Sequence, residues 1–156
     1  MRAPVGYSAD VDRDAYAPLE SRLGYAFLDL VLLESALTHK SFLNENPGAG
    51  RPDNERLEFL GDAVIGLSIS HLLMEAHPGR SEGELTRTRA QLVNESGLAE
   101  VAAEVGLGEW LFLGRGEEQS GGRQKPSLLA DACEALLAAV YQDGGFDAAL
   151  DVVRRL

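Results

Sequence analysis

The pattern of apolar positions divides the chain into helical segments, two of which stand out. The stretch NERLEFLGDAVIGLSISHLLM, 54–74, is apolar on nearly every side beyond its first turns, which is typical of a helix buried in a core. The segment 126–142 is rich in alanine and leucine, and its only charges are Asp131 and Glu134. We expect these two segments to form the central helices of the fold.

The remaining segments show helical spacing with recognisable ends. Asp12, Asp29 and Asp53 are placed to cap helices, and Ser81 with Glu84 forms a capping-box pattern. Gly106 and Gly108 are placed to end the helix at 96–105. The two-residue alternation typical of strands is missing throughout, so the sequence predicts an all-α fold in a single domain, 1–156. Proline and glycine content predicts loops at 44–52 and 115–125, and the expected helices are 12–23, 30–39, 53–77, 81–95, 96–105, 126–142 and 146–156.

Acidic residues interrupt both apolar segments at helical spacing. Glu55, Glu58 and Asp62 follow an i, i+3, i+7 pattern on the first, and Asp131 and Glu134 an i, i+3 pattern on the second. Carboxylates on buried helices are costly, because desolvated like charges raise one another's pKa. A divalent cation between the two acidic faces removes this cost, and all-oxygen ligands favour Mg²⁺, for which Mn²⁺ is a substitute.

Two other interpretations explain the acids less well. Each acid taken singly is compatible with helix capping or a surface ion pair, although this explains five acids on two otherwise apolar helices poorly. A di-iron protein would place Glu-x-x-His on two helices, and none of His39, His71 and His77 fits that motif.

Charge and composition narrow the class of protein further. The net charge of −11 argues against binding nucleic acid through a general basic surface. The single cysteine fits a reducing compartment, the N-terminal residues do not resemble a secretion signal, and the longest uncharged run, 63–74, is too short to span a membrane. We therefore expect a cytoplasmic protein in which a polyanionic substrate is met by cations, by another module, or by local basic side chains: Arg87, Arg89, Arg115, Arg123 and Lys125.

Three motifs resemble a known family. NERLEFLGDAVIGL is similar to the signature of the ribonuclease III family, LADACEALLAAVY to its second motif and LTHKSF to an upstream one, in the same order from about Leu19 onward. The resemblance implies a homodimer of helical nuclease domains that hydrolyses double-stranded RNA with Mg²⁺. It also implies 5′-phosphate and 3′-hydroxyl products and a role in RNA processing, including that of ribosomal RNA.

The resemblance also implies roles for particular residues. Phe59 matches an aromatic residue that inserts into the partner subunit, although ordinary core packing is the other interpretation. Cys133 is expected to pack in the core, and His39 to be a hydrogen-bonding structural residue rather than a general base. The implied metal ligands are Glu58, Asp62, Asp131, Glu134 and, downstream of the signature, Glu82, while Glu55 is a further acid at the cleavage site that helps to hold RNA or the second cation.

The chain departs from many relatives at its end. Those relatives append a basic RNA-binding domain, whereas this sequence stops inside an expected helix, so we expect a truncated final helix. The alternative to an enzyme is a catalytically silent module for dimerisation or RNA binding. Such a module is expected to have lost one or more of the six acids, and all six are present.

Overall fold

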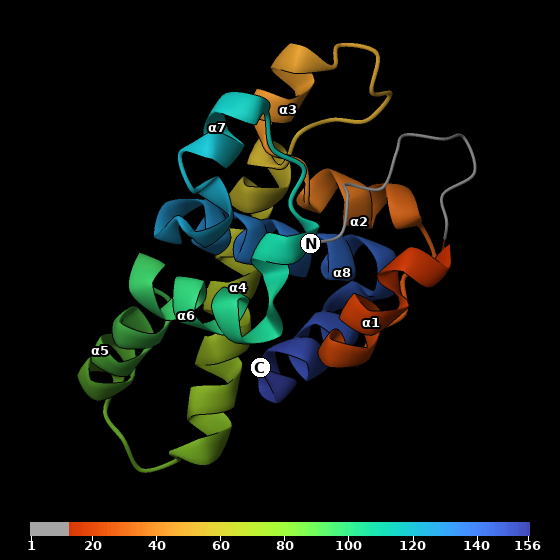
Figure 1. Cartoon of the computed structure of the whole chain (residues 1–156). Helices are drawn as coiled ribbons and strands as arrows, with labels where there is room; N and C mark the ends of the chain where they lie inside the picture. Colours follow the sequence, from red (N-terminus) through yellow and green to blue (C-terminus); the bar gives the residue numbers. More distant parts are fainter. Residues whose placement is uncertain (1–12) are drawn as a thin grey trace.

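Eight α-helices make up the part of the chain that this computed structural model describes, residues 13–156 (Figure 1). Within that range there is no strand, only an isolated parallel bridge between Thr38 and Phe112, so the all-α prediction is confirmed. The predicted cap Asp12 lies outside the described residues. The helices are α1 (Arg13–Leu23), α2 (Leu30–Ala36), α3 (Lys40–Glu45), α4 (Glu55–Ala76), α5 (Glu82–Leu92), α6 (Glu95–Val105), α7 (Arg115–Gln119) and α8 (Pro126–Arg155).

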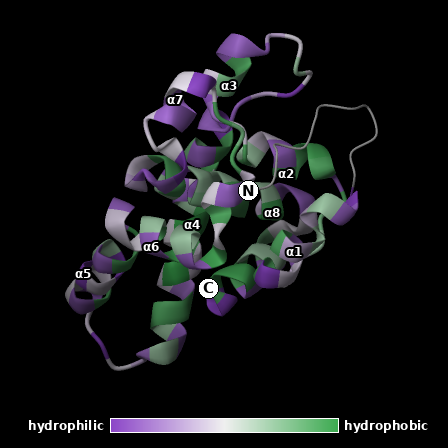
Figure 2. Cartoon of the chain, viewed as in Figure 1, coloured by the Kyte–Doolittle hydropathy of each residue, from purple (hydrophilic) through white to green (hydrophobic). Residues whose placement is uncertain are grey.

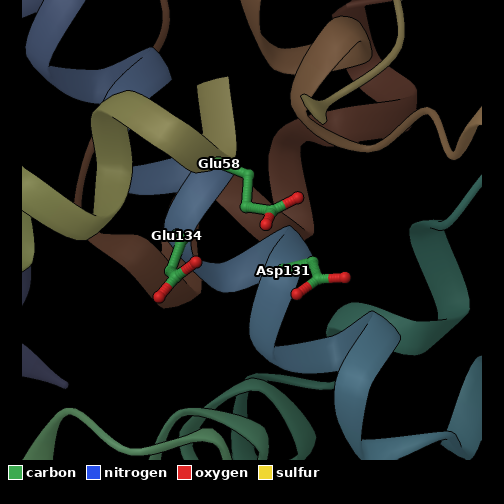
Figure 3. Close-up of side chains that lie close together, drawn as sticks. All are labelled: Glu58, Asp131 and Glu134. Atoms are coloured by element: carbon green, nitrogen blue, oxygen red, sulfur yellow. The ribbon is translucent and has the colours of Figure 1, made fainter. Parts of the chain in front are cut away.

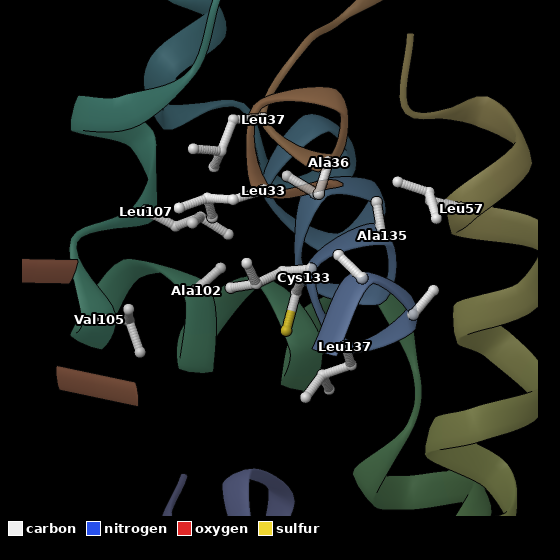
Figure 4. Close-up of a cluster of buried hydrophobic side chains, with 14 of the residues drawn as sticks. Leu33, Ala36, Leu37, Leu57, Ala102, Val105, Leu107, Cys133, Ala135 and Leu137 are labelled. Carbon is white, nitrogen blue, oxygen red and sulfur yellow. The ribbon is translucent and has the colours of Figure 1, made fainter. Parts of the chain in front are cut away.

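The long helix α8 lies at the centre, and α4, α6 and α2 pack along it. Its alanines, such as Ala132 and Ala135, are fully buried and small enough to let neighbouring helices approach closely. Apolar side chains from α2, α6 and α8 fill the space between them (Figure 4). The outer helices α5 and α7 are mostly hydrophilic (Figure 2), so the hydrophobic core is concentrated around α8.

Several helix ends follow the local sequence signals. The Asp29 side chain caps α2 by accepting a hydrogen bond from the Val31 N–H at 2.9 Å. The capping box is formed, since the Ser81 N–H donates to the Glu84 carboxylate at 2.9 Å. Gly106 ends α6 in a left-handed conformation, with φ of 75°. These capping predictions are confirmed because they depend on contacts only a few residues apart.

Other boundaries differ from the prediction. The helix expected at 30–39 ends earlier, at Ala36, and a short helix that was not expected, α3, follows from Lys40. The N-cap of α4 is Asn54 rather than Asp53, although the Asp53 carboxylate still accepts from the Glu55 N–H at 3.2 Å. By contrast, the break predicted between the last two helices is confirmed, because α8 is interrupted at Gly145, whose φ is 83°.

The segment 115–125 was predicted to be a loop, and this prediction was wrong. It forms α7 and a 3-10 turn at Gly122–Gln124. The Arg123 guanidinium donates to the carbonyls of Gly108 at 2.9 Å and Leu111 at 3.0 Å, and to the Glu118 carboxylate at 2.7 Å. These contacts hold the segment against the preceding turn. They order it although its composition is polar and rich in glycine.

A buried ionic network anchors the segment before α4. The guanidinium of Arg51 pairs with the Glu34 carboxylate and lies over the Phe112 ring, 4.1 Å from its centroid. The Tyr16 hydroxyl donates to the same carboxylate at 2.9 Å. Next to this network the Asn54 N–H donates to the Thr38 carbonyl at 2.9 Å. The first turn of α4, which carries the acids, therefore starts from a fixed position.

By length and composition alone, α4 meets the criteria for a membrane-spanning helix, the one helix among the described residues to do so. Core helices of soluble proteins meet the same criteria, so this is weak evidence. The helix carries Glu55, Glu58, Asp62 and Glu75 and packs along α8, which indicates a core helix instead.

Candidate functional site

Three carboxylates from two helices converge at one point. Glu58 of α4 and Asp131 and Glu134 of α8 are half-buried, and one oxygen from each lies within 4.8 Å of the others (Figure 3). We call these three residues the acid cluster. The acid-bearing faces of the two helices therefore meet.

A glycine allows the two helices to come this close. Gly61 lies one turn after Glu58, and a Cβ atom at Gly61 would overlap the backbone carbonyl of Glu134. Any side chain at this position would push α4 away from α8. The absence of a side chain at Gly61 thus sets the distance between the carboxylates of the acid cluster.

The pKa values of the carboxyl groups in the acid cluster are raised above their ordinary values. Burial raises the pKa of Glu134 to about 7, and the neighbouring carboxylates of Asp62, Glu58 and Asp131 add to the effect. Burial also raises the pKa of Asp131, to which the negative charge of Glu95 contributes. The site therefore has an excess of negative charge.

Glu58 shows the same imbalance. Burial raises its pKa first, followed by the charges of Asp131 and Glu55, while Lys40 acts in the opposite direction. No ion pair among the described residues involves a carboxylate of the acid cluster. The structure thus creates a concentrated negative charge that its own basic side chains do not neutralise.

The other acids predicted at the site lie around or apart from the cluster. Asp62 is exposed one turn beyond Glu58, near enough for its charge to raise the pKa of Glu134. Glu55 is exposed at the first turn of α4, and its carboxylate accepts from the Lys40 ammonium at 2.9 Å. Glu82 is exposed at the start of α5, where its carboxylate accepts from the Thr86 hydroxyl at 2.7 Å, and it does not belong to the cluster.

Phe59 and Cys133 occupy opposite environments. The Phe59 side chain is 83% exposed on α4, so ordinary core packing does not explain it. Cys133 is buried among apolar side chains (Figure 4), and burial raises its pKa to about 12. A thiol in this state is a poor nucleophile, in agreement with the predicted core role.

His39 makes the hydrogen bonds expected of a structural histidine. Its Nδ1 accepts from the Ser41 N–H at 3.3 Å and lies 2.8 Å from the Ser41 hydroxyl, which makes His39 the N-cap of α3. The His39 N–H donates to the Phe112 carbonyl at 3.0 Å. Its ring is also near enough to Asp131 to favour the charged carboxylate.

Most of the basic residues nominated from the sequence have partners elsewhere. Arg123 donates to the Gly108 carbonyl at 2.9 Å. Arg89 donates to the Ser70 hydroxyl at 2.8 Å, and Lys125 donates to the Glu117 carboxylate at 3.3 Å. Arg87 and Arg115 are exposed on α5 and α7. None of the five neutralises the acid cluster.

Three residues at the site were missed by sequence reasoning. Gly61 carried a signal, because an isolated glycine inside a helix often marks a close approach of another backbone. The sequence held no signal for Lys40 and Glu95, because it does not show that the starts of α3 and α6 approach the acids.

The acid cluster fits a hard divalent cation. Its ligand atoms are all carboxylate oxygens, the donor set that Mg²⁺ prefers over zinc or copper. One carboxylate oxygen from each residue lies within 4.8 Å of the others, so adjustment of the side chains would let all three bind one cation. The raised pKa of Glu134 is the expected consequence of acids brought together for such an ion.

The fold and the cluster together define an all-α domain with a carboxylate cluster, compatible with a divalent cation, between two central helices. Comparison with known proteins gives the family. The sequence profile described as Ribonuclease-III-like matches residues 29–156, and the chain belongs to that family.

Individual relatives support the assignment. The proteins named ribonuclease 3 from Syntrophobacter fumaroxidans and Syntrophotalea carbinolica are 56% and 53% identical over 92% and 90% of this chain. The chain spans 59% and 60% of their lengths, about three fifths. A solved nuclease domain of ribonuclease III from Campylobacter jejuni matches with a TM-score of 0.82 at 41% identity, covering 90% of this chain and 94% of that one. That structure is described as flexible in a region involved in dimer formation.

Proposed function

We propose that this protein is a Mg²⁺-dependent endonuclease that hydrolyses phosphodiester bonds of double-stranded RNA. Products with 5′-phosphate and 3′-hydroxyl ends, and a role in cytoplasmic RNA processing, including that of ribosomal RNA, belong to the same proposal. The observation that carries it is the convergence of Glu58, Asp131 and Glu134 on one point between α4 and α8. Membership of the ribonuclease-III-like family supports the choice of RNA as substrate.

The acidic side chains have different roles according to their positions on the two helices. Glu58, Asp131 and Glu134 would hold the cation, while Asp62 and Glu55 extend the negative surface along α4 on either side of Glu58. When bound, Mg²⁺ supplies a water of lowered pKa for the attack and positive charge for the leaving oxygen. Burial of the cluster keeps the local dielectric constant low, which strengthens each of these electrostatic effects.

Neither the Cys133 thiol nor the His39 ring offers another route at the acid cluster. Cys133 is buried and its pKa is raised to about 12, so it is not a thiolate near neutral pH. The Nδ1 of His39 is engaged by Ser41 at the start of α3. The acids are therefore the groups through which this chain promotes hydrolysis.

A homodimer is the second part of the proposal. Phe59 is 83% exposed one residue after Glu58, and Leu67 on the same helix is 58% exposed. Large exposed aromatic side chains are typical anchors of protein interfaces. If Phe59 inserts into a second copy, each subunit brings one acid cluster to the duplex, and each cluster cuts one strand.

The test is incubation of the protein with a long, perfectly paired RNA duplex, with Mg²⁺ or with a chelator, followed by analysis of product length and ends. Short duplexes with 5′-phosphates that form only in the presence of Mg²⁺ support the proposal. An intact duplex at high enzyme concentration would favour the silent dimerisation or RNA-binding module instead. Mn²⁺ in place of Mg²⁺ is expected to support cleavage, since it takes the same oxygen ligands.

A further inference from the structure

Lys40 is a basic residue whose side chain lies beside the acidic face of α4. Its ammonium group donates to the Glu55 carboxylate at 2.9 Å. Glu55 and Glu58 are one helical turn apart on the same face, and Glu58 belongs to the acid cluster. The positive charge of Lys40 also opposes the pKa increases of Glu58 and Asp131.

The backbone that carries Lys40 is fixed from two sides. On one side the His39 N–H donates to the Phe112 carbonyl at 3.0 Å, and the Ser41 hydroxyl accepts from the Gly114 N–H at 2.9 Å. On the other side the Thr38 carbonyl accepts from the Asn54 N–H at 2.9 Å, next to the start of α4. Lys40 therefore projects from a rigid position, although its side chain is 60% exposed.

The ion pair between Lys40 and Glu55 is easily exchanged. Both side chains are more than half exposed, at 60% and 56%, and exposed ion pairs contribute little stability. A phosphate oxygen arriving at the cluster would offer the ammonium group an equivalent negative partner. Loss of the pair therefore costs little when substrate binds.

We propose that Lys40 is an RNA-contacting residue, which exchanges its Glu55 partner for a backbone phosphate of the duplex at the acid cluster. This inference rests on the proposed function. It identifies a positive group that binds the negative charge of the RNA in a protein whose own net charge is −11. An ammonium at this position reduces the repulsion between the phosphate and the acids. Lys40 recognises a phosphate rather than a base, so its contribution is independent of RNA sequence.

The test compares Lys40→Gln, Lys40→Arg and the matched control Arg154→Gln. Arg154 on α8 also forms an exposed ion pair, to Glu75 of α4 at 3.1 Å. This pair lies at the opposite end of α4 from the acid cluster. Binding of a fluorescent RNA duplex is measured by anisotropy without divalent cations, so that the duplex stays intact, and kcat and KM of cleavage are measured with Mg²⁺, each over a series of KCl concentrations.

Lys40→Gln is expected to weaken duplex binding about tenfold at low salt, the effect of one charge-assisted hydrogen bond. It is also expected to reduce the slope of log affinity against log salt by about one, which a structural defect alone would not do. Lys40→Arg is expected to restore both, and Arg154→Gln to leave both unchanged. Parental affinity and slope in Lys40→Gln would overturn the inference.

The same data separate this inference from the proposed function. If the parent protein binds the duplex but does not cut it, the nuclease proposal fails, and the anisotropy series still decides the role of Lys40. If the parent cuts the duplex and Lys40→Gln cuts with the same kcat/KM and salt dependence, only the Lys40 inference fails. If the parent neither binds nor cuts, both fail.

Discussion

Gly61 on α4 lies directly against the backbone carbonyl of Glu134 on α8. A Cβ atom at Gly61 would overlap that carbonyl group, so the two helices are in tight backbone contact at a residue of the acid cluster. The helix contact and the spacing of the carboxylates are therefore one structural feature. A change in one changes the other.

Gly61→Ala is expected to destabilise the protein by about 1–3 kcal/mol, because the added methyl group overpacks a tight contact. It should also weaken Mg²⁺ binding by moving Glu58 away from Glu134. Thermal unfolding and calorimetric Mg²⁺ titration measure the two effects. The matched control is Gly66→Ala on the same helix, where a Cβ meets no atom within 4 Å.

Gly66→Ala is expected to keep Mg²⁺ affinity and to gain up to about 1 kcal/mol, because alanine favours a helix more than glycine does. If Gly61→Ala proved as stable as Gly66→Ala, the two helices would not be held together as tightly as the structure indicates.

Much of the architecture follows from the sequence, because helical spacing and caps are local signals. Asp29, the Ser81–Glu84 box and Gly106 act on residues within one turn, and the structure has them where the sequence predicted. Arg123 shows the limit of such reasoning. Its contacts to the Gly108 and Leu111 carbonyls cross 15 and 12 residues and turn a predicted loop into ordered helical turns.

The acids show the same limit within the candidate site. Glu55 and Glu58 belong to the same acidic pattern, yet Glu58 enters the cluster and Glu55 pairs with Lys40. Which acid turns inward depends on where α8 and α3 lie relative to α4. The spacing in the sequence predicts a shared helical face, but it does not describe what that face meets.

Glu134→Gln is expected to abolish Mg²⁺-dependent cleavage of duplex RNA, with kcat/KM reduced by at least about a hundredfold, because a neutral amide is a weak ligand for a hard cation. The fold should be unchanged, as judged by circular dichroism. Glu100→Gln, an exposed acid on α6, serves as the control and is expected to cut normally. Near-parental cleavage by Glu134→Gln would refute the role of Glu134 as a ligand.

Without divalent cations, stability is expected to decrease as pH rises from about 4.5 to about 7. The pKa of Glu134 is raised from 4.5 to about 7 by burial and neighbouring acids, so the folded protein binds more protons than the unfolded chain in this range. After allowance for solvent screening, the loss from this group is about 1–2 kcal/mol. Thermal melts in a chelating buffer measure it.

Two comparisons test this assignment of the pH dependence. Glu134→Gln should flatten the curve and make the metal-free protein more stable at pH 8. Mg²⁺ should stabilise the parent more at pH 8 than at pH 6, because protons compete with the cation for Glu134. Identical pH curves for the parent and Glu134→Gln would show that other groups dominate.

Phe59→Ala is expected to weaken self-association, because a fully exposed phenyl ring is the strongest candidate anchor on α4. Sedimentation equilibrium should show dissociation at concentrations where the parent is dimeric. Leu28→Ala removes a side chain that is 81% exposed but precedes α2, and it is the control for general loss of apolar surface. A Phe59→Ala protein that remains as dimeric as the parent would remove Phe59 from the interface.

Anomalous diffraction from crystals soaked in Mn²⁺ tests the cation site most directly. A single strong peak within bonding distance of carboxylate oxygens from Glu58, Asp131 and Glu134 is the predicted result, and the peak should be lost in Glu134→Gln crystals. Ordered crystals that show these carboxylates without a peak between them, while Mn²⁺ binds elsewhere or not at all, would contradict the account.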